Sequence, residues 1–449
     1  MTLLSPLAPD VRRATVAIAA LALVSLALAG LYATFHHLGS GLALPDFGPS
    51  EREMTLGLLA LSGLLLGWAA LLLALGRAGT AEAVLGAARG AVSRERERPW
   101  AFWLAVVMAV AYAVARVALN EQTRFATIEE VVAGEARRPF SYRVLVPALV
   151  GLISRGPGLS HLSLEAIAGG VEAAAAVAAW AAFARFLRPH VGGDPARARV
   201  AALALLPVLW LTLGSPWRYN DVLFLWDTPS VAAFALGLAL LQERRWGSYY
   251  VLFVVATFNR ETTCFLTIAY VLASLGRVPL QTLALHAGAQ LALWIGVKAA
   301  LSAVVVGAAP PTYVGEGQFI LTYARSLVVL TAVPGWVYLG LAFGGAWLVP
   351  LGLRQRLRGV AFAPYFRVVP VFLYGMALVG ELVEVRIYSE LAPLVVAGLV
   401  VGLWRVAREA AGETGRGVDA PEAAKAGAAP VVASGDGAKG APALSPFPA

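Results

Sequence analysis

The sequence is poor in charged residues and has almost no cysteine. Asp, Glu, Lys and Arg make up 14% of its 449 residues, whereas soluble globular proteins carry about 25%. The single cysteine, Cys264, lies inside an apolar stretch. A disulfide framework and a zinc site built from thiolates are therefore excluded. The low charge also argues against a soluble globular domain.

Apolar sequence takes the place of charge. Hydrophobic residues form 59% of the chain and recur in continuous runs of Ala, Leu and Val, without the alternation typical of barrel strands. A helix of about 20 residues spans the hydrocarbon core of a bilayer. We therefore predict an all-α polytopic transmembrane bundle with about twelve crossings, within a range of roughly 10 to 13. The clearest spans are at about 14–35, 55–76, 100–119, 164–187, 199–214, 228–241, 280–306, 330–353, 368–383 and 391–405.

Two apolar segments do not fit a single crossing. Residues 144–153 are too few to cross, which indicates a re-entrant or interfacial segment. Residues 249–275 are long enough for one tilted helix, but the polar run 259–262 interrupts them. Two short helices meeting at that run are the alternative. Twelve crossings follow either from a non-crossing 144–153 with a broken pair at 249–275, or from one crossing at each segment.

Arginines set the predicted orientation. They gather in short loops between apolar blocks, as the positive-inside rule expects, which also explains the net charge of +8 without nucleic acid as a partner. The first of the two topologies places all these loops, and both termini, in the cytoplasm. The basic groups are Arg77 to Arg98, Arg185 to Arg199, Arg244 with Arg245, Arg354 to Arg367, and Arg405 with Arg408.

The organisation along the chain is predicted in three parts. Residues 1–99 hold two spans and a basic cytoplasmic loop, and 100–409 form the transmembrane core. Residues 410–449 are rich in Ala, Gly and Pro. Such a segment buries too little apolar surface to offset its ordering entropy, so a disordered cytoplasmic tail is predicted.

With this topology, the polar clusters gather on the extracytoplasmic side. Ionisable groups in apolar spans are costly and usually pair with one another or line a wet cavity. The simplest interpretation of these clusters is that they are ion pairs that only join helices. The expected pairs are Arg260–Glu261, Arg218–Asp221 and Arg386–Glu384. A cavity lined by arginines, carboxylates and aromatic rings suits an anionic substrate with a sugar, because guanidinium groups bind phosphate and a carboxylate can act as general base.

From residue 100 to 405 the sequence resembles the GT-C superfamily of polytopic glycosyltransferases, which use polyprenyl-phosphate sugars at the extracytoplasmic face. The resemblance is to an uncharacterised bacterial branch. It is carried by an acidic residue after a span (Glu121, with Glu129 and Glu130 as alternatives), by the run from Arg138 to Pro147, by Tyr219-Asn220-Asp221 followed by Asp227-Thr228-Pro229, and by a helix broken at 259–262.

The resemblance implies transfer of a hexose or pentose from a lipid-linked donor to an acceptor, in the bacterial inner membrane. The predicted catalytic residues are Glu121, which deprotonates the acceptor, and Asp221, which positions other groups. A divalent metal is possible with so many carboxylates, but no ligand spacing requires one. The predicted substrate-binding residues are Arg138, Tyr142, Arg143, Arg218, Tyr219, Asn220, Asn259, Arg260, Glu261, Glu384 and Arg386.

Two other functions fit the same features. Broken helices with buried charges are also typical of secondary transporters, so a transporter or flippase for an anionic or lipid-linked substrate is the first alternative. The second is a non-catalytic membrane scaffold, in which the charged clusters only hold helices together.

Overall fold

A computed structural model describes residues 7–37, 51–120, 122, 126–136, 140–159, 161–213, 223–305, 333–380 and 384–413. These residues form helices and no β-strand, as the composition predicts. They belong almost entirely to one compact unit, residues 1–412. The predicted tail lies outside the described residues beyond Glu413.

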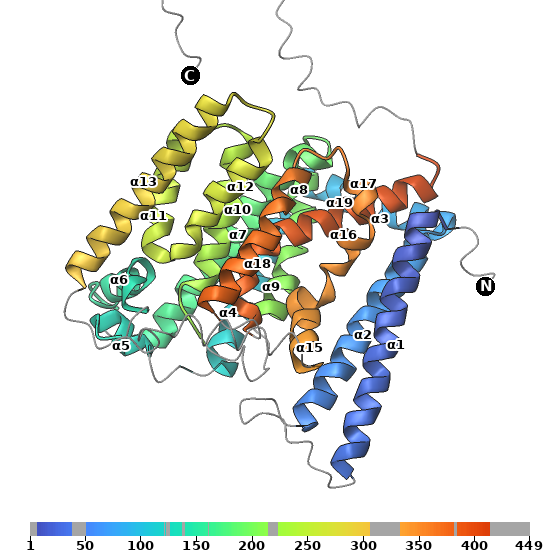
Figure 1. Cartoon of the computed structure of the whole chain (residues 1–449), viewed down its shortest axis with the longest axis horizontal. Helices are drawn as coiled ribbons and strands as arrows, with labels where there is room; N and C mark the ends of the chain where they lie inside the picture. The colour runs from blue at the N-terminus through green and yellow to red at the C-terminus, as the bar shows by residue number, and fades with distance from the viewer. Residues whose placement is uncertain are drawn as a thin grey trace, which may run out of the picture. The chain divides into compact units, whose positions relative to one another are not determined.

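The helices follow one another along the whole described chain, and Figure 1 shows them in colours that run from blue to red. Their bounds are α1 (Pro9–His37), α2 (Glu51–Leu75), α3 (Ala78–Glu97), α4 (Trp100–Leu119), α5 (Ile128–Ala133), η2 (Phe140–Tyr142), α6 (Leu145–Ser154), α7 (Leu164–Leu187), η3 (Arg188–Val191), α8 (Pro195–Ala202), α9 (Leu205–Leu213), α10 (Asp227–Gln242), α11 (Trp246–Asn259), η4 (Glu261–Thr263), α12 (Cys264–Ser274), α13 (Leu280–Val304), α15 (Val333–Leu341), η5 (Ala342–Gly345), α16 (Leu348–Gly352), α17 (Arg354–Leu357), η6 (Ala363–Arg367), α18 (Val368–Val379), η7 (Val385–Leu391) and α19 (Ala392–Ala410).

Seven stretches of the described chain are long and apolar enough to cross a membrane. They are Pro9–Gly30, Met54–Leu75, Trp100–Leu119, Leu164–Val191, Pro195–Leu213, Leu280–Val304 and Val385–Ala410. The chain is thus a membrane protein by the length and composition of its helices. The count of twelve crossings stays a prediction.

The two ambiguous segments are short helices. Helix α6 has 10 residues, about half the length that a crossing needs. The segment 249–275 is broken, because Arg260 has an extended backbone between α11 and η4. The broken-pair interpretation of this segment is therefore confirmed.

The expectation of one continuous helix over 330–353 is wrong for its described part. Phe343 and Gly344 have φ angles of 56° and 62°, in the left-handed region, and they separate α15 from α16. The Trp68 indole donates a hydrogen bond of 2.9 Å to the Gly344 carbonyl that this break exposes. Trp68 lies on α2, so the break joins the N-terminal helices to the core.

Ion pairs between arginines and acidic residues gather at one end of the helices, which we call the basic end. Arg96 and Arg199 reach Asp194 and Glu95, each at 2.6 Å. Arg185 at the end of α7 bonds Glu243 after α10. Burial raises the pKa of Asp194, but the hydrogen bond and charge of Arg96, together with hydrogen bonds from the backbone of Ala196 and Arg197, outweigh burial and leave that pKa below its ordinary value.

The same end includes the start of α1 and the end of α19. Arg356 of α17 bonds both Asp10 and Glu409 there. The basic loops predicted to lie on one side thus meet at one end of the bundle. The positive-inside rule assigns this end to the cytoplasm, and that orientation stays a prediction.

Cysteine labelling tests the orientation, with Cys264→Ser as background. Ser93 on α3 and Glu135 after α5 are both exposed. We expect an impermeant maleimide to label Glu135→Cys in intact spheroplasts, and Ser93→Cys only after permeabilisation. Labelling of both from the same side contradicts the topology.

The break at Gly344 gives a stability prediction. A Cβ atom there would adopt a left-handed conformation and approach Leu211 Cδ1 to 2.4 Å. The conformation alone costs about 1–2 kcal/mol, so Gly344→Ala should lower the melting temperature in detergent. Gly296→Ala on α13, where an added Cβ would meet no atom within 4 Å apart from the adjoining residues and the backbone of its own helix, is the matched control and should not lower it. Equal melting temperatures would show that the break does not need glycine.

Candidate functional site

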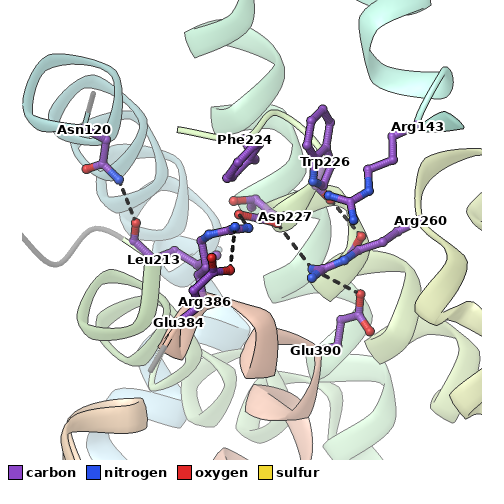
Figure 2. Close-up of polar contacts among 12 residues, drawn as sticks. Asn120, Arg143, Leu213, Phe224, Trp226, Asp227, Arg260, Glu384, Arg386 and Glu390 are labelled. Carbon is purple, nitrogen blue, oxygen red and sulfur yellow. Dashed lines mark hydrogen bonds and ion pairs between the residues drawn. The ribbon is translucent and has the colours of Figure 1, made fainter. Parts of the chain in front are cut away.

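Asp227 lies at the centre of a buried group of charges (Figure 2). Helix α10 begins at Asp227, and Glu243 after its other end belongs to the basic end, so the group lies at the opposite end of α10. Asp227 is fully buried. Its carboxylate is 3.1 Å from Arg116, 3.3 Å from Arg260 and 3.8 Å from Arg386. The positive end of the α10 dipole also favours a carboxylate at this position.

Arg116 holds the first side of this group from the last turn of α4. Its side chain is fully buried and lies 2.8 Å from Glu172 of α7. It also donates to the Thr228 hydroxyl at 2.9 Å and to the Phe224 carbonyl at 3.2 Å. These bonds tie α4, α7 and α10 together through one guanidinium.

Arg260 holds the second side from the break between α11 and η4. Besides Asp227 it lies 3.5 Å from Glu390 of η7. The preceding Asn259 donates to the Trp226 carbonyl at 2.9 Å and to Ser230 at 2.8 Å. These bonds fix the break against α10, so the polar interruption of the helix aims Arg260 at Asp227.

Arg143 lies nearer the surface, after η2. It bonds Glu261 at 2.9 Å, with 10% of its own side chain and 32% of the Glu261 side chain exposed. Its guanidinium lies over the Trp226 ring, 4.8 Å from the centroid. The Trp294 indole of α13 donates to the Glu261 carbonyl at 2.9 Å.

Arg386 of η7, like Arg143, bonds a partly exposed carboxylate and lies over an aromatic ring. It bonds Glu384 at 2.8 Å, with 9% and 29% of the two side chains exposed. Its guanidinium lies 4.0 Å from the centroid of Phe224. The centroids of the Phe224 and Trp226 rings are 5.0 Å apart. Arg386 lies over the first of these neighbouring rings and Arg143 over the second.

These charges have an inner and an outer part. The inner part, Arg116, Glu172, Asp227, Arg260 and Glu390, is at most 3% exposed at its side chains. The outer part consists of the pairs Arg143–Glu261 and Arg386–Glu384, whose carboxylates are about one-third exposed. We call the nine residues together the charged cluster.

The charged cluster holds four arginines and five carboxylates, so its opposite charges nearly balance. Yet Arg143 Nε, Arg260 Nε and Glu390 Oε2 are buried without a hydrogen-bond partner among the described residues. Buried polar atoms are normally satisfied by protein or water. The cluster therefore has capacity for further hydrogen bonds.

The structure brings together six of the thirteen site residues predicted from sequence. Arg143, Arg260, Glu261, Glu384 and Arg386 are members of the charged cluster, and Asn259 supports it. Tyr142 lies beside it, with its ring 4.8 Å from Lys298 Nζ. The other predicted residues lie outside the described part of the chain: Glu121, Arg138, Arg218, Tyr219, Asn220 and Asp221.

The expected ion pairs are partly corrected. The pair Arg386–Glu384 is confirmed at 2.8 Å. The expected direct pair Arg260–Glu261 is wrong, because Glu261 bonds Arg143 while Arg260 turns to Asp227 and Glu390. Neighbours at a helix break point in different directions, so adjacency in sequence does not make them partners.

The alternative acidic residues after α4 have a simpler role. Glu130 completes a capping box with Thr127 at the start of α5, with both reciprocal hydrogen bonds present. Glu129 is exposed. Glu130 is thereby explained as a helix cap.

Sequence reasoning missed the inner partners. Arg116 and Glu172 stand inside predicted spans, and Glu390 follows the predicted pair Arg386–Glu384 in the sequence. A lone charge in an apolar helix is itself a signal of a buried partner. Applied to Arg116 and Glu172, that signal predicts their ion pair.

No metal site is evident in the part of the chain that the structure describes: no group of three or more His, Cys, Asp or Glu is placed to hold an ion. In the charged cluster, the carboxylates are paired with guanidinium groups.

No family model, curated protein or solved structure matches this chain.

The inner part predicts a strong effect on stability. Asp227→Asn removes the carboxylate that three arginines share, and breaking a buried ion pair costs about 3–5 kcal/mol. We expect a large drop in the melting temperature of the purified protein. Glu384→Gln, at a partly exposed outer carboxylate, is the control and should cost no more than about 1 kcal/mol. Equal losses would show that the inner and outer parts do not differ.

Proposed function

We propose that the protein is a membrane glycosyltransferase that moves a sugar from a polyprenyl-phosphate carrier to an acceptor at the extracytoplasmic face. The observation that carries the proposal is the convergence of four arginines from distant segments on one end of an apolar bundle. Joining helices needs fewer charges, since replacing buried ion pairs by apolar residues is often neutral or stabilising.

The outer arginines are the ones suited to bind phosphate. Arg143 and Arg386 each rest on an aromatic ring and bond a carboxylate that is partly exposed. A phosphate group presents oxygens to a guanidinium much as a carboxylate does. Exchange of Glu261 or Glu384 for the donor phosphate would keep both arginines paired.

Charge balance makes that exchange necessary. With four arginines and five carboxylates in the cluster, an added phosphate anion meets no excess of positive charge. Binding is favourable only when a carboxylate leaves its arginine and moves toward water. Glu261 and Glu384, about one-third exposed, are the members free enough to do so.

The proposed reaction follows from this arrangement. The acceptor hydroxyl attacks the anomeric carbon of the donor, the bond from that carbon to the phosphate oxygen breaks, and Glu121 takes the hydroxyl proton. Negative charge grows on the departing phosphate, which Arg143 and Arg386 stabilise. Arg260, being almost fully enclosed, holds Asp227 and Glu390 beneath them. Arg138 and Asp221, which lie outside the described residues, remain proposed members of the site.

A transporter for the same kind of lipid is the second candidate, and the break at Arg260 favours it. Discontinuous helices that bring charged groups into a membrane bundle are a feature of secondary transporters. The two candidates differ in what happens to the donor: a transferase cleaves it, whereas a transporter moves it intact.

Reconstituted protein with radiolabelled hexosyl and pentosyl polyprenyl phosphates separates the candidates. We expect sugar release or transfer by the native chain and an about 100-fold loss of rate in Arg386→Gln, as for other groups that stabilise transition-state charge. The control is Arg185→Gln at the basic end, which should keep full rate. Movement of intact donor across the bilayer without cleavage would support the transporter and overturn the transferase.

A further inference from the structure

Lys298 is an unexplained cation in the membrane-spanning part of the chain. It lies on α13, the least enclosed of the seven long apolar helices, with 17% of its most apolar window buried inside the protein. Lys298 is half-buried and makes no ion pair with any described residue. Its ammonium instead lies over the Tyr142 ring, 4.8 Å from the centroid.

A lysine is costly on a helix that faces lipid, and such residues usually pair or serve a substrate. An explanation that gives Lys298 no functional role is that its side chain extends along the helix and places the ammonium at the membrane surface. Its position over Tyr142 argues against that, because this contact directs the ammonium toward η2 and the charged cluster.

Glu261 connects Lys298 to the cluster. The carboxylate interacts electrostatically with both Arg143 and Lys298, and Arg143 is its hydrogen-bond partner. One turn before Lys298, Trp294 is hydrogen-bonded to the Glu261 backbone, which fixes α13 against η4. Glu261 is thus bonded to Arg143, and its carboxylate is also close enough to Lys298 to be affected by that charge.

We propose that Lys298, Tyr142 and Arg143 form a headgroup subsite, open to the bilayer side, that takes the phosphate of a membrane lipid. The phosphate replaces Glu261 between the two cations, and the lipid chain extends along the exposed face of α13. The subsite rests on the proposed function, because it explains how a lipid-linked donor reaches Arg386 without leaving the bilayer.

The test measures lipid binding apart from catalysis. Full-length protein is placed in phosphatidylcholine nanodiscs that contain polyprenyl monophosphate, with a photo-crosslinking residue at the exposed Ile295. We expect crosslinking to the lipid, an about tenfold weaker binding in Lys298→Gln, as for loss of one charge-assisted hydrogen bond, and retention in Lys298→Arg. Arg277→Gln, an exposed cation before the start of α13, is the control and should bind normally.

The outcomes separate the subsite from the function and from the source of phosphate. Unchanged binding in Lys298→Gln overturns the subsite, even if Arg386→Gln abolishes sugar transfer. Weaker binding in Lys298→Gln supports the subsite even if no donor is cleaved, which would overturn the transferase alone. Full displacement of the crosslink by equimolar inorganic phosphate would show that the cations bind free phosphate, and would overturn a lipid subsite.

Discussion

A carboxylate can be buried among membrane helices only where cations surround it. Asp227 meets this condition by sharing three arginines that come from α4, from the break after α11 and from η7. Each of these arginines has a further acidic partner: Glu172, Glu390 and Glu384 respectively. Segments more than 250 residues apart in sequence, such as α4 and η7, are therefore joined through one carboxylate. A substitution at Asp227 would disturb the packing of all of them.

The two ends of the bundle use charge differently. At the basic end, Arg96, Arg185 and Arg199 are partly exposed, and ion pairs in contact with water contribute little to stability. In the charged cluster, the arginines are nearly enclosed and depend on their partners for solvation. The first arrangement joins helix ends, and the second places a polar cluster inside apolar surroundings.

Periodicity and length predicted the helical bundle, the short segment at 144–153 and the break at 259–262, because apolar runs and their interruptions are local features. Arg143, Arg260, Glu261, Glu384 and Arg386 were predicted from charge in apolar context. Their partners were not, because pairing depends on how distant helices pack: Arg116 meets Glu172 across 56 positions. The left-handed Phe343 was unpredictable, since bulky residues rarely adopt that conformation.

In the proposed function, the partly exposed carboxylates of Glu261 and Glu384 compete with the incoming phosphate for Arg143 and Arg386. Any anion that enters must bind the fraction of molecules in which a carboxylate has moved away, so its apparent affinity falls by that fraction. Small soluble anions, which gain only the arginine contacts, would be disfavoured by this competition. A ligand with an apolar chain would gain additional binding energy from the apolar helix faces, so the proposed competition would select amphipathic anions over small ones.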